Sequence, residues 1–153
     1  MNGSNSPRSV RNNNPGNLVR TNIAWEGLST PDEMTPEQQQ ETRFSVFAGA
    51  EWGFRALGRD LHSKWLRGLD TIRQIITVYA PPNENDTEAY IGAVSEMMQV
   101  APDQPLALGN ASQLAALCRA IAVHEAGGWL FSDEDLNQGV RMALGEEPTP
   151  TVV

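Results

Sequence analysis

The spacing of apolar positions predicts a chain dominated by helices. From residue 51 onward, apolar side chains recur every three or four positions, as they do on the buried face of an amphipathic helix. The expected helices cover residues 51–66, 71–80, 86–98, 111–125 and 133–144. Capping residues and helix breakers mark their ends. In chain order these are Asp70, Pro81 with Pro82, Asn85 with Glu88 as a capping box, Asn110, Ser132 and Gly145.

The segment 111–125 differs from the other helices because it is apolar on almost every side, interrupted mainly by Gln113 and Arg119. We therefore expect it to be a buried central helix. Before residue 51 the sequence is turn-like, and apolar and polar residues alternate only briefly, at 18–21 and 43–47. The pattern predicts a mainly α fold, of α+β type, with five or so helices around the central one and one or two short N-terminal strands.

The length of 153 residues suits one domain that can bury its own core. Residues 1–10 and 146–153 lack periodicity and are rich in residues that favour turns, so we expect them to be flexible tails. The domain then covers residues 11–145. No apolar run is long enough for a membrane span, and the polar start of the chain does not resemble a signal peptide, so we expect no membrane partner.

The charge and the reactive residues exclude several classes of function. A formal net charge of −8 opposes binding to phosphate backbones, so nucleic acid is not an expected partner. Cys118 is the single cysteine, and His62 and His124 are isolated. We therefore expect no disulfide, no zinc site and no other cofactor. Motifs for a phosphate loop or a nucleophilic serine are absent as well.

Glu125 is the first candidate for catalysis. It follows Leu114, Cys118 and Ile121 at helical spacing, so it continues the apolar stripe of the central helix close to its C-terminal end. Partial burial and the negative end of the helix dipole both disfavour an ionised carboxylate, which suits a general acid. The alternative is that Glu125 turns into solvent where the helix frays.

Glu51 is the rival carboxylate. It lies at a predicted helix N-terminus, where the dipole stabilises the charged form. That position suits either helix capping or a base that orients water.

Polar turns and aromatic rings indicate where a sugar ligand would bind. Amides offer paired donors and acceptors for hydroxyl and N-acetyl groups, and aromatic rings offer apolar faces. The alternatives are ordinary ones, namely turn formation for the asparagines and core packing for the rings. The candidate substrate-binding residues are Asn14, Asn17, Trp25, Tyr79, Asn83, Asn85, Tyr90 and Trp129.

Several blocks between residues 11 and 130 resemble a family of phage virion and lysis proteins with a lysozyme-like domain. They are Arg11-Asn-Asn-Asn-Pro-Gly-Asn-Leu18, Trp25-Glu-Gly27, Phe44-Ser-Val-Phe47, Glu51-Trp-Gly-Phe-Arg-Ala-Leu57, the segment 79–91 (YAPPNENDTEAYI) and Ala120-Ile-Ala-Val-His-Glu-Ala-Gly-Gly-Trp129. The resemblance implies a lysozyme-like fold that degrades peptidoglycan.

A more distant similarity is to bacterial cell-wall glucosaminidases of the flagellar type. Their Glu-Ser-Gly-Trp motif at a helix end is similar to the segment 125–129, and their later Asn-Leu, Trp-x-Gly and Phe-containing blocks are similar to segments that here come first. The order is that of a circular permutation, which domains with neighbouring termini tolerate. The similarity implies Glu125 as the general acid, although Ala126 replaces the serine of the motif and one glycine is added before Trp129.

Together these observations predict a phage-type enzyme that cleaves peptidoglycan glycan strands, as a lysozyme or a lytic transglycosylase. A transglycosylase needs one acid, whereas a hydrolase also needs a group that orients water, such as Glu51 or Asp86. The protein would be made in the host cytoplasm and reach the cell wall through a holin, a virion or an injection apparatus, with other virion proteins as further partners. The alternatives are a non-catalytic virion or baseplate component that keeps the fold and glycan binding and, ranked last, a peptide-cleaving enzyme, for which Cys/His or zinc ligands are missing.

Overall fold

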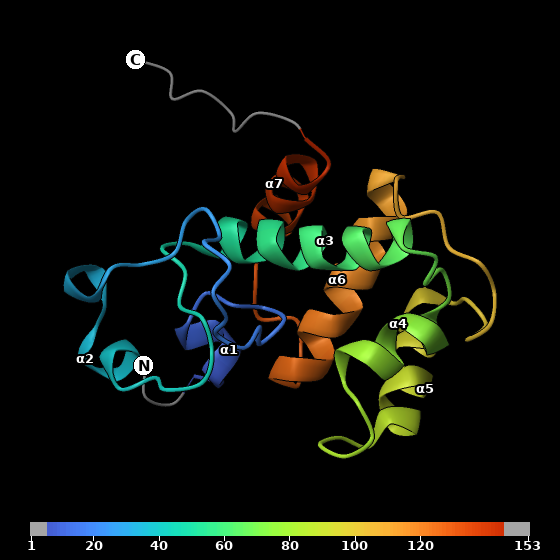
Figure 1. The fold of residues 1–153 in the computed structure, drawn as a ribbon, viewed down its shortest axis with the longest axis horizontal. Helices are drawn as coiled ribbons and strands as arrows, with labels where there is room; N and C mark the ends of the chain where they lie inside the picture. Colours follow the sequence, from blue (N-terminus) through green and yellow to red (C-terminus); the bar gives the residue numbers. More distant parts are fainter. Residues whose placement is uncertain (1–5, 146–153) are drawn as a thin grey trace.

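The computed structural model describes residues 6–145, and within them the chain is mainly α-helical (Figure 1). The five expected helices are present with nearly the predicted bounds. Three short helical elements that we did not predict precede them among the described residues. In chain order the elements are α1 (Arg8–Arg11), a 3-10 helix η2 (Pro31–Glu33), α2 (Pro36–Gln39), α3 (Ala50–Leu66), α4 (Ile72–Tyr79), α5 (Thr87–Met98), α6 (Ala111–Ala126) and α7 (Asp133–Ala143).

Part of the segment that we expected to be an N-terminal tail, residues 1–10, is helical in the structure. Residues 8–11 form α1, which packs against α6, and Ser9 in it is buried. The polar composition of this segment did not indicate a helix that packs on the core, because its attachment depends on a residue far along the chain. The Arg8 guanidinium donates hydrogen bonds to the carboxylate of Glu41. Residues 1–5 and the expected tail at 146–153 lie outside the described residues.

The two expected strands do not form within residues 6–145. The segments meet in the isolated antiparallel bridge between Val19 and Phe44, and a second bridge joins Leu28 to Phe47. A longer β-ladder would need backbone amides that are free to pair between the two segments, but several of these amides donate hydrogen bonds to side chains instead. The amide of Leu18 donates to Asn14 Oδ1, and the amide of Phe44 donates to Glu41.

Two of the helix caps differ from the prediction by one residue. Thr71, rather than Asp70, accepts the hydrogen bond at the start of α4, and Asp86, rather than Asn85, accepts the bond from Ala89 at the start of α5. In both cases the helix begins one residue later than the hydrophobic pattern suggested, so the next polar side chain reaches the first turn. Asn110 and Ser132 cap α6 and α7 as expected.

The core forms around α6, as the sequence predicted. Figure 1 shows α6 passing behind α3, with α7 on one side and the α4–α5 pair on the other. Its buried side chains include Leu114, Leu117 and Ile121. No helix within residues 6–145 combines the length and apolar character needed to cross a membrane.

Small residues bring α3 and α7 into close contact. A Cβ atom added to Gly139 of α7 would lie 2.7 Å from the Glu51 carbonyl oxygen and 2.8 Å from the Arg55 amide nitrogen of α3. The two backbones therefore approach until only a hydrogen atom fits between them. This contact fixes α3, and α3 forms one wall of the cavity described next.

Candidate active site

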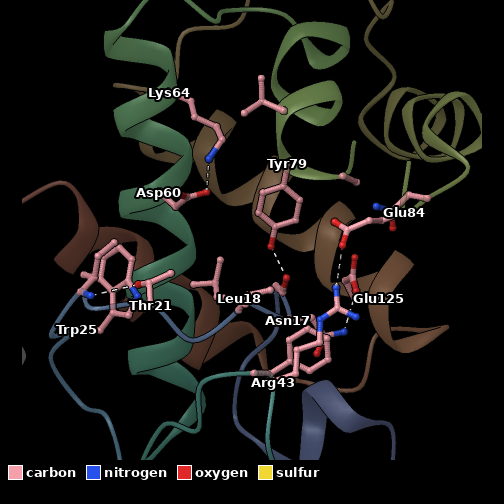
Figure 2. Close-up of a pocket in the computed structure, with 17 residues that line it drawn as sticks. Asn17, Leu18, Thr21, Trp25, Arg43, Asp60, Lys64, Tyr79, Glu84 and Glu125 are labelled. Atoms are coloured by element: carbon pink, nitrogen blue, oxygen red, sulfur yellow. Dashed lines mark hydrogen bonds and ion pairs between the residues drawn. The ribbon is translucent and has the colours of Figure 1, made fainter. Parts of the chain in front are cut away.

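A cavity of about 680 Å³ opens between several parts of the chain. Its walls come from the loop at residues 16–25, the C-terminal half of α3, the end of α4 and the end of α6, with further residues from the loops at 43–44 and 84–85 (Figure 2). Three of the sequence-predicted residues that line it come from three of these parts, namely Asn17, Tyr79 and Glu125. Segments more than 100 positions apart in the sequence thus build a single site.

Glu125 points into this cavity and does not turn away into solvent at the end of α6. Its Oε1 accepts a hydrogen bond of 2.7 Å from Asn17 Nδ2, and its Oε2 accepts one of 2.7 Å from the Tyr90 hydroxyl. Gly127 then ends α6 in the left-handed conformation, with a φ of 80° that glycine adopts without strain. The carboxylate is therefore fixed at both oxygens, with one side facing the cavity.

The turn that carries Asn17 is shaped by close contacts with α3 and α4. Asn17 itself has a φ of 49°, a left-handed conformation that asparagine tolerates better than most residues. The Tyr79 hydroxyl donates to the Gly16 carbonyl oxygen, and a Cβ atom at Gly16 would collide with that hydroxyl and with Leu57. Gly16 thus lets the turn approach Tyr79 closely enough for Asn17 to reach Glu125.

Asn14 does not line the cavity, contrary to the prediction. It is fully buried, and its Nδ2 donates to the carbonyl oxygens of Leu18 and Ser45 at 3.0 and 2.9 Å. Its Oδ1 accepts from the Leu18 amide. All of its polar atoms are therefore used to hold the turn together, which explains the asparagine without a ligand.

The two tyrosines of the site remain protonated and act through their hydroxyl groups. Burial raises the pKa of Tyr79 well above its ordinary value, and the negative charges of Glu125 and Asp60 raise it further. Burial likewise raises the pKa of Tyr90, whose ring stacks on the exposed His124 at 3.8 Å between centroids. Tyr90 lies behind Glu125 as a hydrogen-bonding partner rather than in the cavity wall.

The structure separates the remaining candidates into two groups. Trp25 and Asn85 line the cavity, whereas Asn83, Trp129 and Glu51 do not. The Trp129 ring packs against Phe54 and Phe131 and under the Arg119 guanidinium. Glu51 lies in the first turn of α3, on the part of that helix that meets α7. Asp86, the other suggested water-orienting group, uses its Oδ1 to cap α5.

Sequence reasoning missed four charged residues that line the cavity. Asp60 and Lys64 lie one turn apart on α3, and Asp60 Oδ2 is 2.7 Å from Lys64 Nζ. Arg43 and Glu84 form a looser pair, at 3.8 Å, across the mouth. The i,i+4 spacing of Asp60 and Lys64 was a usable signal for a pair, but nothing in it showed that the pair faces the cavity. No group of three metal-ligating side chains converges within residues 6–145.

Comparison with known proteins shows that this chain is similar in sequence to a phage protein. No protein-family model matches the chain. It is, however, 30% identical over 136 residues to Protein P5 of Pseudoalteromonas phage PM2, and the match covers 86% of this chain and 79% of that protein. Such identity over most of both chains shows common ancestry, so the chain belongs to the family of phage PM2 Protein P5.

Proposed function

We propose that this protein cleaves the glycan strands of peptidoglycan, with Glu125 as the general acid. The observation that supports this most directly is the position of Glu125, which lies in the wall of a solvent-accessible cavity with both oxygens held by neutral donors. A carboxylic acid so oriented can protonate the oxygen of a glycosidic bond that lies in the cavity.

The partners of Glu125 suit a group that loses a proton during the reaction. Once Glu125 has given up its proton, the Asn17 amide and the Tyr90 hydroxyl both donate to the resulting carboxylate. Bonds to the charged form are stronger than those to the neutral acid, so they favour proton transfer as it proceeds. Before transfer, the Tyr90 hydroxyl is able to accept a bond from the acid instead, because a hydroxyl both donates and accepts.

The walls of the cavity provide the kinds of surface that bind sugars. Trp25 and Val78 offer apolar faces, while Thr21 and Asn85 offer hydrogen-bonding groups. We propose that these residues hold sugar rings on either side of the bond that is cut. In this proposal the substrate is the host cell wall, which the protein reaches from a virion or by release from the infected cell, and the relationship to a phage protein supports this reading.

The proposal is tested by incubating purified peptidoglycan with the wild type and with Glu125→Gln, followed by mass spectrometry of the soluble products. Glu88→Gln is the matched control, because Glu88 is an exposed carboxylate outside the cavity that pairs with Arg73. We expect soluble muropeptides from the wild type and the control. Loss of a general acid should reduce their rate of release in Glu125→Gln by roughly 10²–10⁴-fold.

Two results would overturn this proposal in different ways. Intact peptidoglycan after treatment with folded wild-type protein would favour a non-catalytic virion component that keeps the fold. Undiminished digestion by Glu125→Gln would show that another carboxylate is the acid, and the other acidic residues that line the cavity, Asp60 and Glu84, would then be the next to replace. A Trp25→Ala variant adds a binding test, since it should sediment less with peptidoglycan while unfolding at the wild-type temperature.

A further inference from the structure

A second carboxylate faces the same cavity as Glu125, from a different helix. Asp60 projects from the middle of α3, and Figure 2 shows the Tyr79 ring between the labelled side chains of Asp60 and Glu125. Both negative charges act on the buried Tyr79 hydroxyl. The two carboxylates therefore face one cavity from two of its walls, α3 and the end of α6.

The surroundings of Asp60 leave one of its oxygens available. Its Oδ2 is bound by Lys64, whose own side chain is almost entirely buried, at 9% exposure, whereas the Asp60 side chain is 28% exposed. Within the described part of the chain, no hydrogen-bond donor contacts Asp60 Oδ1. Lys64 thus fixes one oxygen of the carboxylate and leaves the second without a donor from the described part of the chain, on a residue that lines the cavity.

The other acidic groups near the cavity do not have this combination of features. Glu84 is half exposed at the mouth and pairs with Arg43. Asp86 is occupied as a helix cap, and Glu51 lies outside the cavity. Among the acidic residues at 6–145 that line the cavity, Asp60 alone is both fixed by a buried cation and open at one oxygen.

We propose that Asp60 is the second catalytic carboxylate and that the enzyme is therefore a hydrolase; this rests on the function proposed above. Glu125 gives its proton to the glycosidic oxygen, and the bond between that oxygen and the anomeric carbon breaks with its electron pair going to the oxygen. Asp60 takes a proton from a water molecule as the water oxygen bonds to the anomeric carbon. The products are an alcohol on one sugar and a reducing end on the other, and solvent then exchanges the protons of both carboxyl groups.

This assignment predicts the chemistry of the new chain ends. Hydrolysis leaves reducing ends, which sodium borodeuteride reduces and labels with deuterium, whereas a lytic transglycosylase leaves anhydro ends that the reagent does not touch. We expect deuterium-labelled ends from wild-type digests. Asp60→Asn should release them more slowly by a factor on the order of 10² or more, because asparagine cannot accept the proton from water.

A double variant separates catalysis from charge pairing. If Asp60 served only to neutralise the buried Lys64, removal of both charges in Asp60→Asn with Lys64→Met would restore digestion. We expect the double variant to fold, as judged by circular dichroism and thermal unfolding, and to be as slow as Asp60→Asn. It also keeps the test valid if an unpaired Lys64 prevents the single variant from folding.

The outcomes distinguish this inference from the function on which it rests. Anhydro ends from the wild type, undiminished digestion by Asp60→Asn, or recovery in the double variant would each refute the role of Asp60 and leave the glycan-cleaving function standing. An absence of digestion by the wild type would refute both. Labelled ends that depend on Asp60 and also on Glu125 would establish the pair.

Discussion

A buried carboxylate, Glu41, ties the N-terminal segment to the loop before α3. Its oxygens accept bonds of 2.8 and 2.7 Å from Arg8 and one of 2.9 Å from Asn12. They also accept from the backbone amides of Arg43 and Phe44, both at 2.9 Å. Because this cluster joins α1 and the start of the turn that carries Asn17 to residues 43 and 44, its loss should be measurable as a loss of stability.

We expect Glu41→Gln to lower the free energy of unfolding by about 2–3 kcal/mol. Removing one partner of a fully buried ion pair costs about 3–5 kcal/mol, and an exposed pair contributes about 1 or less. The Glu41 side chain is 3% exposed but that of Arg8 is 43% exposed, so solvent relieves part of the penalty. For a chain of this length the melting temperature should fall by roughly 5–10 °C.

The effect should depend on pH in a definite direction. Hydrogen bonds hold the pKa of Glu41 well below its ordinary value of 4.5, against the opposing effect of burial. The bond from Arg8 contributes most, and the bonds from the Phe44 amide, Asn12 and the Arg43 amide contribute less. A lowered pKa in the folded state gives stability that is present above the unfolded value and is lost as the pH falls below it. The difference between wild type and variant should therefore be constant from pH 6 to 8 and shrink below about pH 4.5.

Urea unfolding followed by circular dichroism at several pH values measures this difference. Glu88→Gln serves as the control, because it removes an equivalent charge from an exposed ion pair and should change the stability by less than about 1 kcal/mol at every pH. A stability loss in Glu41→Gln that matched this control, or one that did not diminish in acid, would refute the reasoning.

Three further predictions follow from the packing. Gly139→Ala should destabilise the protein by about 1–3 kcal/mol because the added methyl group meets the α3 backbone. Gly92→Ala, at a helical site where the added Cβ atom has no atom within 4 Å, should stabilise it by about 0.5–1 kcal/mol. Equal effects of the two changes in denaturant titrations would contradict the close contact between α3 and α7. Tyr90→Phe should cost about 1 kcal/mol and leave Glu125 Oε2 without its donor, so peptidoglycan release should be slower than in the wild type, whereas Gly92→Ala should release it at the wild-type rate. Burial raises the pKa of the Cys118 thiol, so iodoacetamide should modify it only in denaturant, and mass spectrometry of rapidly labelled native protein would detect any earlier reaction.

Much of the helical structure follows from the sequence because its causes are local. Apolar residues at helical spacing identified the five longer helices, and Asn110 and Ser132 marked two starts correctly. The stripe that runs through Leu114 and Cys118 also indicated the side of α6 on which Glu125 lies. Periodicity and capping act over a few residues, so the order of residues alone contains this information.

The structure of the N-terminal region could not be predicted from local patterns because it depends on side chains that are far apart in the sequence. Neither the anchoring of α1 nor the reduction of two strands to single bridges is visible in the local pattern of residues 8–47. Asn14 and Asn17 belong to the same turn-like sequence, but Asn14 is fully buried within the turn whereas Asn17 reaches the cavity and bonds Glu125. The difference depends on which groups the folded chain brings within hydrogen-bonding distance.

Local sequence patterns predict the helices, the buried central helix and the position of Glu125 near its end, because each depends on spacing within a single element. The packing of the folded chain was needed to show that Asn17, 108 positions away, bonds Glu125 and that Asp60 and Lys64 share its cavity. It also excluded Glu51 from that cavity. The physical reason is that a site is defined by contacts between elements, and those contacts depend on how the helices pack, which no short-range pattern encodes.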